Sequence, residues 1–381
     1  MGPFSSYLFM NVLHIPFVAP ELVFIPFFFL LYKKLGISFD GKVSFFGVIA
    51  IWMFFLIVAF LWSIWDYGAI LSTARSFLIL GIFYAIGLKI RFDDSLSKIL
   101  LLCSIGSLIG WLIQSILNVQ AYMLFLGAHD ESVVYGNMIA IAFAFSISLL
   151  MRSNYITFLL VFAINVFISF TSSLRRQISV SILSLLLSVG MVSLKNRRIN
   201  YLILIGIVSI PIYIAMPQIE QTVADISPNI HYRVFERTQD MLEGNFANGD
   251  QGRYKHQFII FEDFLELIIP HGFVSQHTGK HIGTGVFNDV PMYMLSYSFG
   301  VITLLIYSLY YIARLRFALV SFIKKGNSYY GVIFVVGAVM FFLHFVESTM
   351  FTVSYTAPFT GLTFGLLFRK RLSNNVSKYK I

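Results

Sequence analysis

Residues 43–61 read VSFFGVIAIWMFFLIVAFL, a stretch of nineteen residues that contains no charge and no proline. A helix rises about 1.5 Å per residue, so this segment would be roughly 28 Å long. That length is close to the hydrocarbon thickness of a bilayer, about 30 Å. The segment therefore predicts a transmembrane helix.

Ten other apolar segments of similar length occur along the chain. Hydrophobic residues make up 58% of the sequence, charged residues 12%, and the mean hydropathy is +0.81. A soluble domain is excluded, because this much apolar surface exceeds what one core can bury. We predict an all-α polytopic integral membrane protein of about eleven transmembrane helices, at residues 13–31, 43–61, 69–88, 99–117, 133–150, 155–170, 178–194, 201–216, 290–312, 330–345 and 351–368.

Lys and Arg residues fall mainly in every second gap between these segments. Of the 27, nineteen lie in the gaps that the positive-inside rule assigns to the cytoplasm. The net charge of +9 is therefore mainly an orientation signal, and no nucleic-acid partner is expected. Orientation does not require the other eight, so we interpret them as contacts for an anionic substrate at the outer face. They are Arg75, Arg175, Arg176, Arg233, Arg237, Arg253, Lys255 and Lys280.

A hydrophilic stretch at 217–289 separates two predicted membrane domains, at 1–216 with eight spans and at 290–381 with three spans and a cytoplasmic tail. It carries ten acidic residues and five of the eight histidines, and the charge pattern places it outside. Within it, apolar residues recur at helical spacing over 258–268 with acidic residues between them. This pattern predicts an amphipathic helix on the membrane or on the spans, ended by Pro270 and Gly272.

Two short motifs could bind phosphate groups. Arg175 and Arg176 are adjacent in an outer turn, and paired guanidinium groups suit bidentate contacts to phosphate oxygens. The alternative is that they extend to lipid headgroups. Arg253 follows Gly252 in a glycine-rich turn that allows close backbone approach to a phosphate, although a loop arginine of this kind can also be merely solvated.

The end of the hydrophilic stretch carries candidate general bases. His271, His277, His281 and Asp289 lie close together in sequence, and His or Asp can accept a hydroxyl proton. A zinc site at His277 and His281 is the alternative. It is disfavoured because Gly279 weakens a helix there and the single cysteine of the chain, Cys103, lies in an apolar span.

Ionisable residues inside the predicted spans are few, and the main ones are Glu21, Arg75, His344 and Glu347. Charge in lipid is costly unless it is paired or hydrated, so we expect these groups to face an outward cavity. For Arg75, pairing with Glu21 or Glu347 and contact with substrate both remain open.

Four motifs, in this order and spacing, give a resemblance to a known family. They are Val134-Tyr135-Gly136-Asn137, Ser173-Leu174-Arg175-Arg176, Gly252-Arg253 followed by Pro270-His271-Gly272, and Asn288-Asp289 before the ninth span. Together they cover roughly 133–312. In this region the chain resembles the O-antigen polymerase and ligase superfamily of bacterial cell-surface polysaccharide assembly, and most closely its polymerase branch.

The resemblance implies a glycosyltransferase that needs no metal and no other cofactor. Its donor and acceptor would be glycans on undecaprenyl pyrophosphate, joined into O-antigen or capsular polysaccharide at the periplasmic face of the bacterial inner membrane. Membrane lipids and a chain-length regulator would be further partners. The resemblance assigns pyrophosphate binding to Arg175 or Arg176 and to Arg253, and we add Arg75 as a candidate contact.

Two departures from the family pattern affect the predicted catalytic residues. Gln257 stands where the family usually has an aromatic residue, and Asn288-Asp289 replaces the His-Asn pair of ligases. We therefore name Asp289 and His281 as alternative bases beside Arg253. A ligase that transfers polymer to the lipid A core, and a transporter of a lipid-linked oligosaccharide, are the alternative functions.

Overall fold

The computed structural model describes residues 42–62, 67–90, 175–196, 200–226, 228–236, 264–273, 291–326, 328–346 and 357–369, with single positions at 156, 160, 163, 239, 240 and 243. These residues form helices and contain no strand, which confirms the all-α class for them. The count of about eleven transmembrane helices stays a prediction. The elements are α3 (Lys42–Trp62), α4 (Tyr67–Lys89), α9 (Arg175–Asn196), α10 (Asn200–Ile226), α11 (Pro228–His231), the π-helix η2 (Tyr232–Glu236), the 3-10 helix η3 (Glu266–Ile268), α16 (Pro291–Phe299), α17 (Val301–Lys325), α18 (Ser328–Val346) and α20 (Ala357–Phe368).

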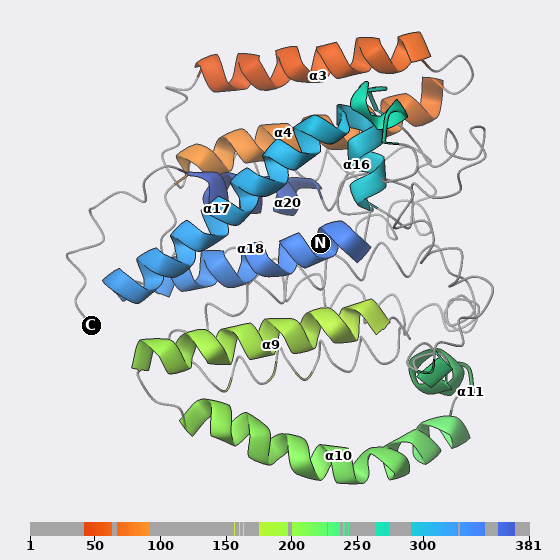
Figure 1. Ribbon diagram of the computed structural model, residues 1–381, viewed down its shortest axis with the longest axis vertical. Coiled ribbons are helices and arrows are strands. Elements are labelled where there is room, and N and C mark those ends of the chain that lie inside the picture. The colour runs from red at the N-terminus through yellow and green to blue at the C-terminus, as the bar shows by residue number, and fades with distance from the viewer. Residues whose placement is uncertain are drawn as a thin grey trace, which may run out of the picture.

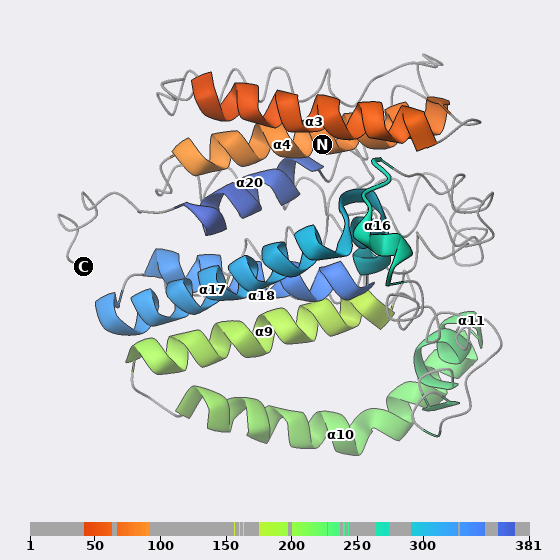
Figure 2. The ribbon, with the colours of Figure 1, turned by 45° about the horizontal axis from the view of Figure 1, so that its top comes forward.

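The long helices lie side by side in a layered bundle (Figures 1 and 2). α4, α9, α17 and α20 all end on the same side, at the left in both figures. We call this side the basic end, because basic residues stand in or just after the last turn of each helix: Lys89, Lys195, Lys324, Lys325 and Arg369. On the opposite side, which we call the loop end, α9 begins and α10 leads into α11. The cations predicted to share one side of a membrane thus meet at one end of the bundle.

α20 packs on α4 with backbone facing backbone. A Cβ atom placed on Gly87 would lie 2.8 Å from the Cα atom of Gly365, and one on Gly361 would overlap the carbonyl oxygen of Leu80. Every residue of α20 is buried. Small residues four apart allow this approach, and the resulting dispersion attraction is a main source of helix association in lipid, where the hydrophobic effect is absent.

α3 packs against α4 on another face. A Cβ atom on Gly81 would lie 2.6 Å from Val48 Cγ1, so this contact also depends on a missing side chain. The indole Nε1 of Trp52 donates a hydrogen bond to the carbonyl oxygen of Ala74, at 2.6 Å. Trp52 is half-buried in this helix pair, where its indole N–H is best paired with such an acceptor, so this bond helps to set the position of α3 along α4.

The predicted continuous span at 290–312 is wrong. Gly300 adopts φ 85° and separates α16 from α17, a conformation that glycine tolerates and other residues avoid. The amide of Gly300 still donates to the carbonyl oxygen of Ser296, at 2.8 Å. The carbonyl oxygen of Gly300 accepts the hydrogen bond of the first turn of α17, from the amide of Leu304 at 3.1 Å. Hydropathy does not report backbone dihedral angles, so the break is invisible in the apolar pattern.

α17 continues to Lys325 and ends at Gly326, which has φ 63°. Arg314, which we expected in a gap, therefore lies within this helix. Its guanidinium donates to the carbonyl oxygens of Leu367, at 3.1 Å, and of Arg369. Arg369 in turn donates to the carbonyl oxygen of Ile90, so two arginines satisfy free carbonyls at the ends of α20 and α4.

α10 is longer than the predicted span at 201–216, because it continues to Ile226. The predicted boundary between membrane domain and outer stretch thus falls inside a helix. Pro211 and Pro217 do not end it, and α10 curves along its length in Figure 1. The polar last turns of α10 place Glu220 and Asp225 at the loop end.

His344 does not face an outward cavity, contrary to our expectation. It is fully buried between α17, α18 and α20, and its ring stacks on Phe364 at 5.6 Å. The hydroxyl of Tyr307 lies 2.7 Å from Nε2, and the carbonyl oxygen of Met340 lies 2.6 Å from Nδ1. Because the carbonyl only accepts, Nδ1 carries the proton and Tyr307 donates to Nε2. The polar atoms of the ring are satisfied, so this histidine joins helices.

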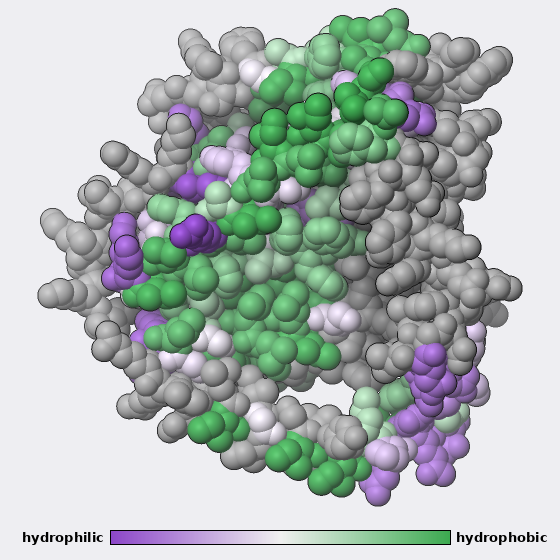
Figure 3. Space-filling view, viewed as in Figure 1, coloured by the Kyte–Doolittle hydropathy of each residue, from purple (hydrophilic) through white to green (hydrophobic). Residues whose placement is uncertain are grey.

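The surface of the bundle is compatible with lipid. Two described helical segments, Ser179–Asn196 and Val301–Lys325, are long and apolar enough to cross a membrane by length and composition. Large apolar side chains are exposed along α3 and α17, among them Ile57, Leu61, Ile306 and Leu309. Figure 3 shows this hydrophobic surface extending over α3 and the first half of α17. In water such surface would be costly, and in a bilayer it is the expected exterior.

The α4–α20 contact predicts that Gly365→Ala destabilises the fold. The added methyl group would displace α20 from α4, with an expected cost of about 1–3 kcal/mol. Gly190→Ala in α9 is the matched control, because no atom lies within 4 Å of a Cβ placed there. Thermal unfolding in detergent should show a lower midpoint for Gly365→Ala than for the control. Equal midpoints would show that the contact is not tight.

Candidate functional site

The predicted site residues are described to different extents. Arg253, His281 and Asp289 lie outside the described residues, so their positions stay predictions. Arg175 and Arg176 form the first turn of α9, where the backbone is described and the side chains are not. Arg75 lies on α4 with an exposed side chain.

The start of α9 is an electrostatically unusual place for two cations. The first turn of a helix presents unpaired N–H groups and the positive end of the helix dipole. A basic residue there is disfavoured by about 0.3–1 kcal/mol, and the first turn of α9 contains no acidic residue that would offset this. An anion bound at this position would be favoured by both the N–H groups and the guanidinium groups.

Arg75 is not brought beside Arg175 and Arg176. It lies eight residues after the start of α4, about 12 Å along the helix from the loop end. α17 and α18 lie between α4 and α9 in both ribbon views. Arg75 therefore belongs to a different layer of the bundle from the arginine pair.

The segment 270–273 is anchored in the bundle at the loop end. Gly272 adopts φ 81° and fits against the backbone of α3, where a Cβ atom would overlap Phe55 and Ala59. The amide of Gly272 donates to the carbonyl oxygen of Ser298 in α16 at 3.0 Å. Phe273 is buried in an aromatic cluster whose other members are Trp52, Phe55, Phe77 and Phe299.

His271, one of the sequence candidates near the predicted base, is a structural residue. Its ring is buried and stacks on Tyr297 with centroids 4.0 Å apart, and Nδ1 donates to the carbonyl oxygen of Tyr297 at 3.3 Å. Burial lowers the pKa of His271 from its ordinary 6.5, against the opposing effects of the Tyr297 carbonyl and the Glu266 charge. The ring is therefore neutral. It is buried and held by Tyr297, so it is not placed to accept a proton from a substrate.

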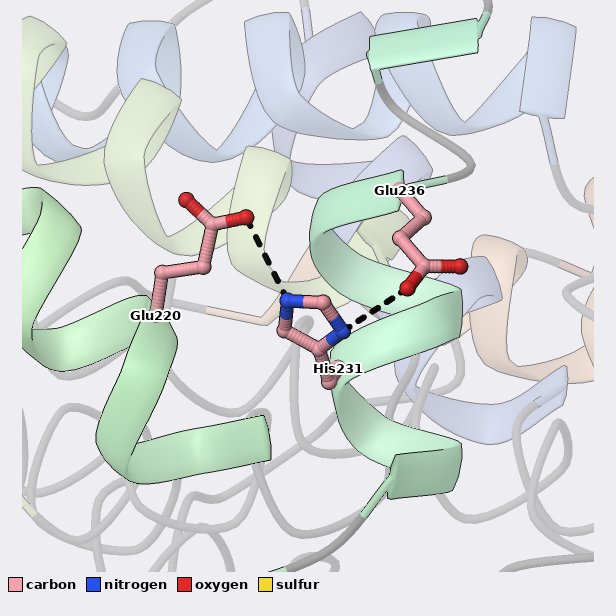
Figure 4. A network of polar contacts seen from close by, with 3 residues as sticks. All are labelled: Glu220, His231 and Glu236. Atoms are coloured by element: carbon pink, nitrogen blue, oxygen red, sulfur yellow. Dashed lines mark hydrogen bonds and ion pairs between the residues drawn. The ribbon is translucent and has the colours of Figure 1, made fainter. Parts of the chain in front are cut away.

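A second histidine lies between two carboxylates at the loop end (Figure 4). Nε2 of His231 is 3.3 Å from Glu220 Oε1, and Nδ1 is 3.1 Å from Glu236 Oε1. The two nitrogens point to opposite sides of the ring, so these carboxylates cannot ligate one metal ion together with it. The histidine instead bridges the two carboxylates and connects α10, α11 and η2.

Sequence reasoning missed the His231 cluster. Glu220 is eleven residues before His231 across a turn, and Glu236 is five residues after it, so neither has α-helical spacing. The π-helix at η2 accounts for the second contact, because its wider turn brings residues four to five apart onto one face. The available signal was the concentration of acidic residues and histidines in 217–289.

The predicted amphipathic helix is described only at its end. From 264 to 269 the chain forms a turn and the short helix η3, and Ile269 at its end is extended. Leu267 is buried against the core, while Phe264, Leu265, Ile268 and Ile269 are exposed. The pattern expected from the sequence is not found at this end: the apolar residues and the acidic Glu266 are exposed together, and the segment is a turn and a 3-10 helix in place of the predicted α-helix.

Comparison of the chain with protein-family models, with curated proteins and with solved structures found no match.

The neutral state of His271 predicts a loss of stability in acid. Because its pKa is lowered in the folded protein, the stabilisation is complete above about pH 6.5 and is lost as the pH falls through the folded value. His271→Asn keeps a donor and does not titrate, so its unfolding midpoint should fall less than that of the native protein between pH 7.5 and 5.5. The other histidines are present in both proteins, so a difference between the two pH dependences comes from residue 271. If the unfolding midpoints of both proteins fell in parallel, this assignment would be contradicted.

Proposed function

We propose that the protein is an integral-membrane glycosyltransferase of about eleven transmembrane helices that polymerises oligosaccharide units carried on undecaprenyl pyrophosphate. The basic end would face the cytoplasm and the loop end the periplasm of a bacterial inner membrane. The product would be O-antigen or capsular polysaccharide. This function is the one that the four sequence motifs favour.

The observation that carries the proposal is the position of Arg175 and Arg176. They lie in the first turn of α9, and Lys195 lies in the last turn of the same helix, at the opposite end of the bundle. Both the positive-inside rule and the helix dipole disfavour cations there. A diphosphate held at this turn would account for both features with one ligand.

The chemistry needs charge neutralisation and one proton acceptor. The bond between the anomeric carbon of the growing chain and its diphosphate oxygen breaks, and a new bond forms to a hydroxyl oxygen of the acceptor unit. The diphosphate leaves with the bonding pair and is stabilised by Arg175, Arg176 and Arg253. The hydroxyl proton passes to Asp289 or His281.

Two parts of the described structure support an active loop end. Arg253 lies in sequence between two described segments, the one containing His231 and the anchored one containing Phe273. Both segments lie on the same side of the bundle as the start of α9. We expect Arg253 to act at this side.

Replacing Arg253 by Lys should abolish most activity while the protein still inserts. Lysine keeps the charge and loses the planar fork, and losing one charged hydrogen bond costs about 1.5–3 kcal/mol, or roughly 10- to 100-fold in rate. Arg316→Lys, at an exposed position of α17, is the matched control and should keep normal turnover. The measurement is elongation of the lipid-linked unit by purified protein, without an ion gradient. Normal elongation by Arg253→Lys would remove this residue from the site.

The same elongation assay tests the proton acceptor, and a cell-based comparison tests the ligase alternative. Asp289→Asn or His281→Ala should reduce turnover, and full activity in both variants would exclude both residues as the base. A ligase would be shown by cells in which loss of the protein leaves bare lipid A core, since loss of a polymerase leaves single units on the core. Transport without elongation would identify a transporter.

A further inference from the structure

We infer that Phe264, Leu265, Ile268 and Ile269 form an apolar tip that inserts into the outer leaflet of the bilayer and is covered by lipid acyl chains. This inference rests on the membrane placement in the proposed function and is independent of the chemistry. The tip would hold the end of the long outer stretch at the depth of the lipid headgroups. The occupant is the bilayer itself.

The first argument is exposure. Phe264, Leu265, Ile268 and Ile269 are 42%, 81%, 37% and 53% exposed, four large apolar side chains within six residues, and Glu266 is the one charged residue exposed among them. A short loop in water would carry polar residues at such positions. Leu309, in the middle of the exposed face of α17, is 69% exposed, so the tip resembles the part of the molecule that would face lipid.

The second argument is that the tip is held rigidly. Leu267, between the exposed residues, is fully buried in the main core, and Phe273 follows in the aromatic cluster with α3. The carbonyl oxygen of Ile268 lies over Gly300, where a Cβ atom would be 3.0 Å away. The apolar side chains therefore cannot turn inward without breaking these contacts, and their exposure is built into the fold.

The third argument is continuity with the lipid-compatible surface. The tip packs against α16 and the start of α17, where Ile302 and Ile306 are exposed, and the neighbouring end of α3 exposes Leu61. Figure 3 shows hydrophobic surface passing from α3 to α17 across this region. A bilayer that covers α3 and α17 would also reach the tip.

Alternative occupants are less consistent with these observations. A second copy of the chain would cover the tip together with parts of α3 and α17, and a soluble partner would have to reach a surface level with the ends of the spans. Both alternatives predict a dry, protein-covered tip in which oxygen and polar reagents are equally excluded. The lipid alternative predicts access for apolar reagents.

Spin labels provide the test, because the chain has a single cysteine, Cys103. In a Cys103→Ser background, labels are placed by Leu265→Cys and Ile269→Cys in full-length protein in nanodiscs of phosphatidylethanolamine and phosphatidylglycerol. Collision rates are measured with oxygen, which concentrates in lipid, and with a water-soluble nickel chelate. Leu309→Cys serves as the lipid reference and Glu243→Cys, in the hydrophilic stretch, as the water reference.

The tip labels should have an oxygen-to-nickel ratio near that of position 309 and several-fold above that of position 243. If the tip labels collided mainly with the nickel chelate while the label at position 309 collided mainly with oxygen, the inference would be overturned and the proposed function left intact. If the label at position 309 also collided mainly with the nickel chelate, the inference and the membrane placement in the proposed function would both be overturned. Labels shielded from both reagents, or broadened by a second label nearby, would show a protein-covered tip and would also overturn the inference.

Discussion

The close contact between α4 and α20 is the constraint on which the described structure depends. Glycines at 87, 361 and 365 bring a helix from the beginning of the chain against one from its end. α3 packs on α4, and the far end of α3 receives Gly272 and Phe273. The segment 270–273 is therefore placed by the packing of α3 on α4 together with its backbone hydrogen bonds to α16.

The bundle has two chemically different ends. At the basic end, Arg314 and Arg369 satisfy free carbonyls of α20 and α4, so cations there have structural partners inside the protein. At the loop end, Arg175 and Arg176 stand where a helix dipole opposes them. The same residue type thus has backbone partners inside the protein at one end, and at the other end the proposed function assigns it to a ligand.

The helices predicted best from sequence are those whose ends are set by polarity. α3, α4, α9 and α18 agree with their predicted spans to within a few residues, because a charged or polar residue follows each apolar run. The break at Gly300 was missed because it depends on a backbone angle, and the α4–α20 contact because it depends on atoms that glycine lacks. His231 and His271 were not assigned correctly, since their partners come from other elements and from backbone carbonyls. For the candidate site, the sequence grouped Arg75 with the arginine pair, the structure separates them, and the role of the pair stays a prediction.

The most direct test of the central claim asks on which side of the membrane α9 begins. In the cysteine-free background, Arg176→Cys and Lys195→Cys place single thiols at the two ends of this helix. Intact spheroplasts are treated with a membrane-impermeant maleimide and compared with lysed cells. The account predicts labelling of position 176 in intact spheroplasts and of position 195 only after lysis. The reverse pattern would place the arginine pair in the cytosol and contradict an external diphosphate site.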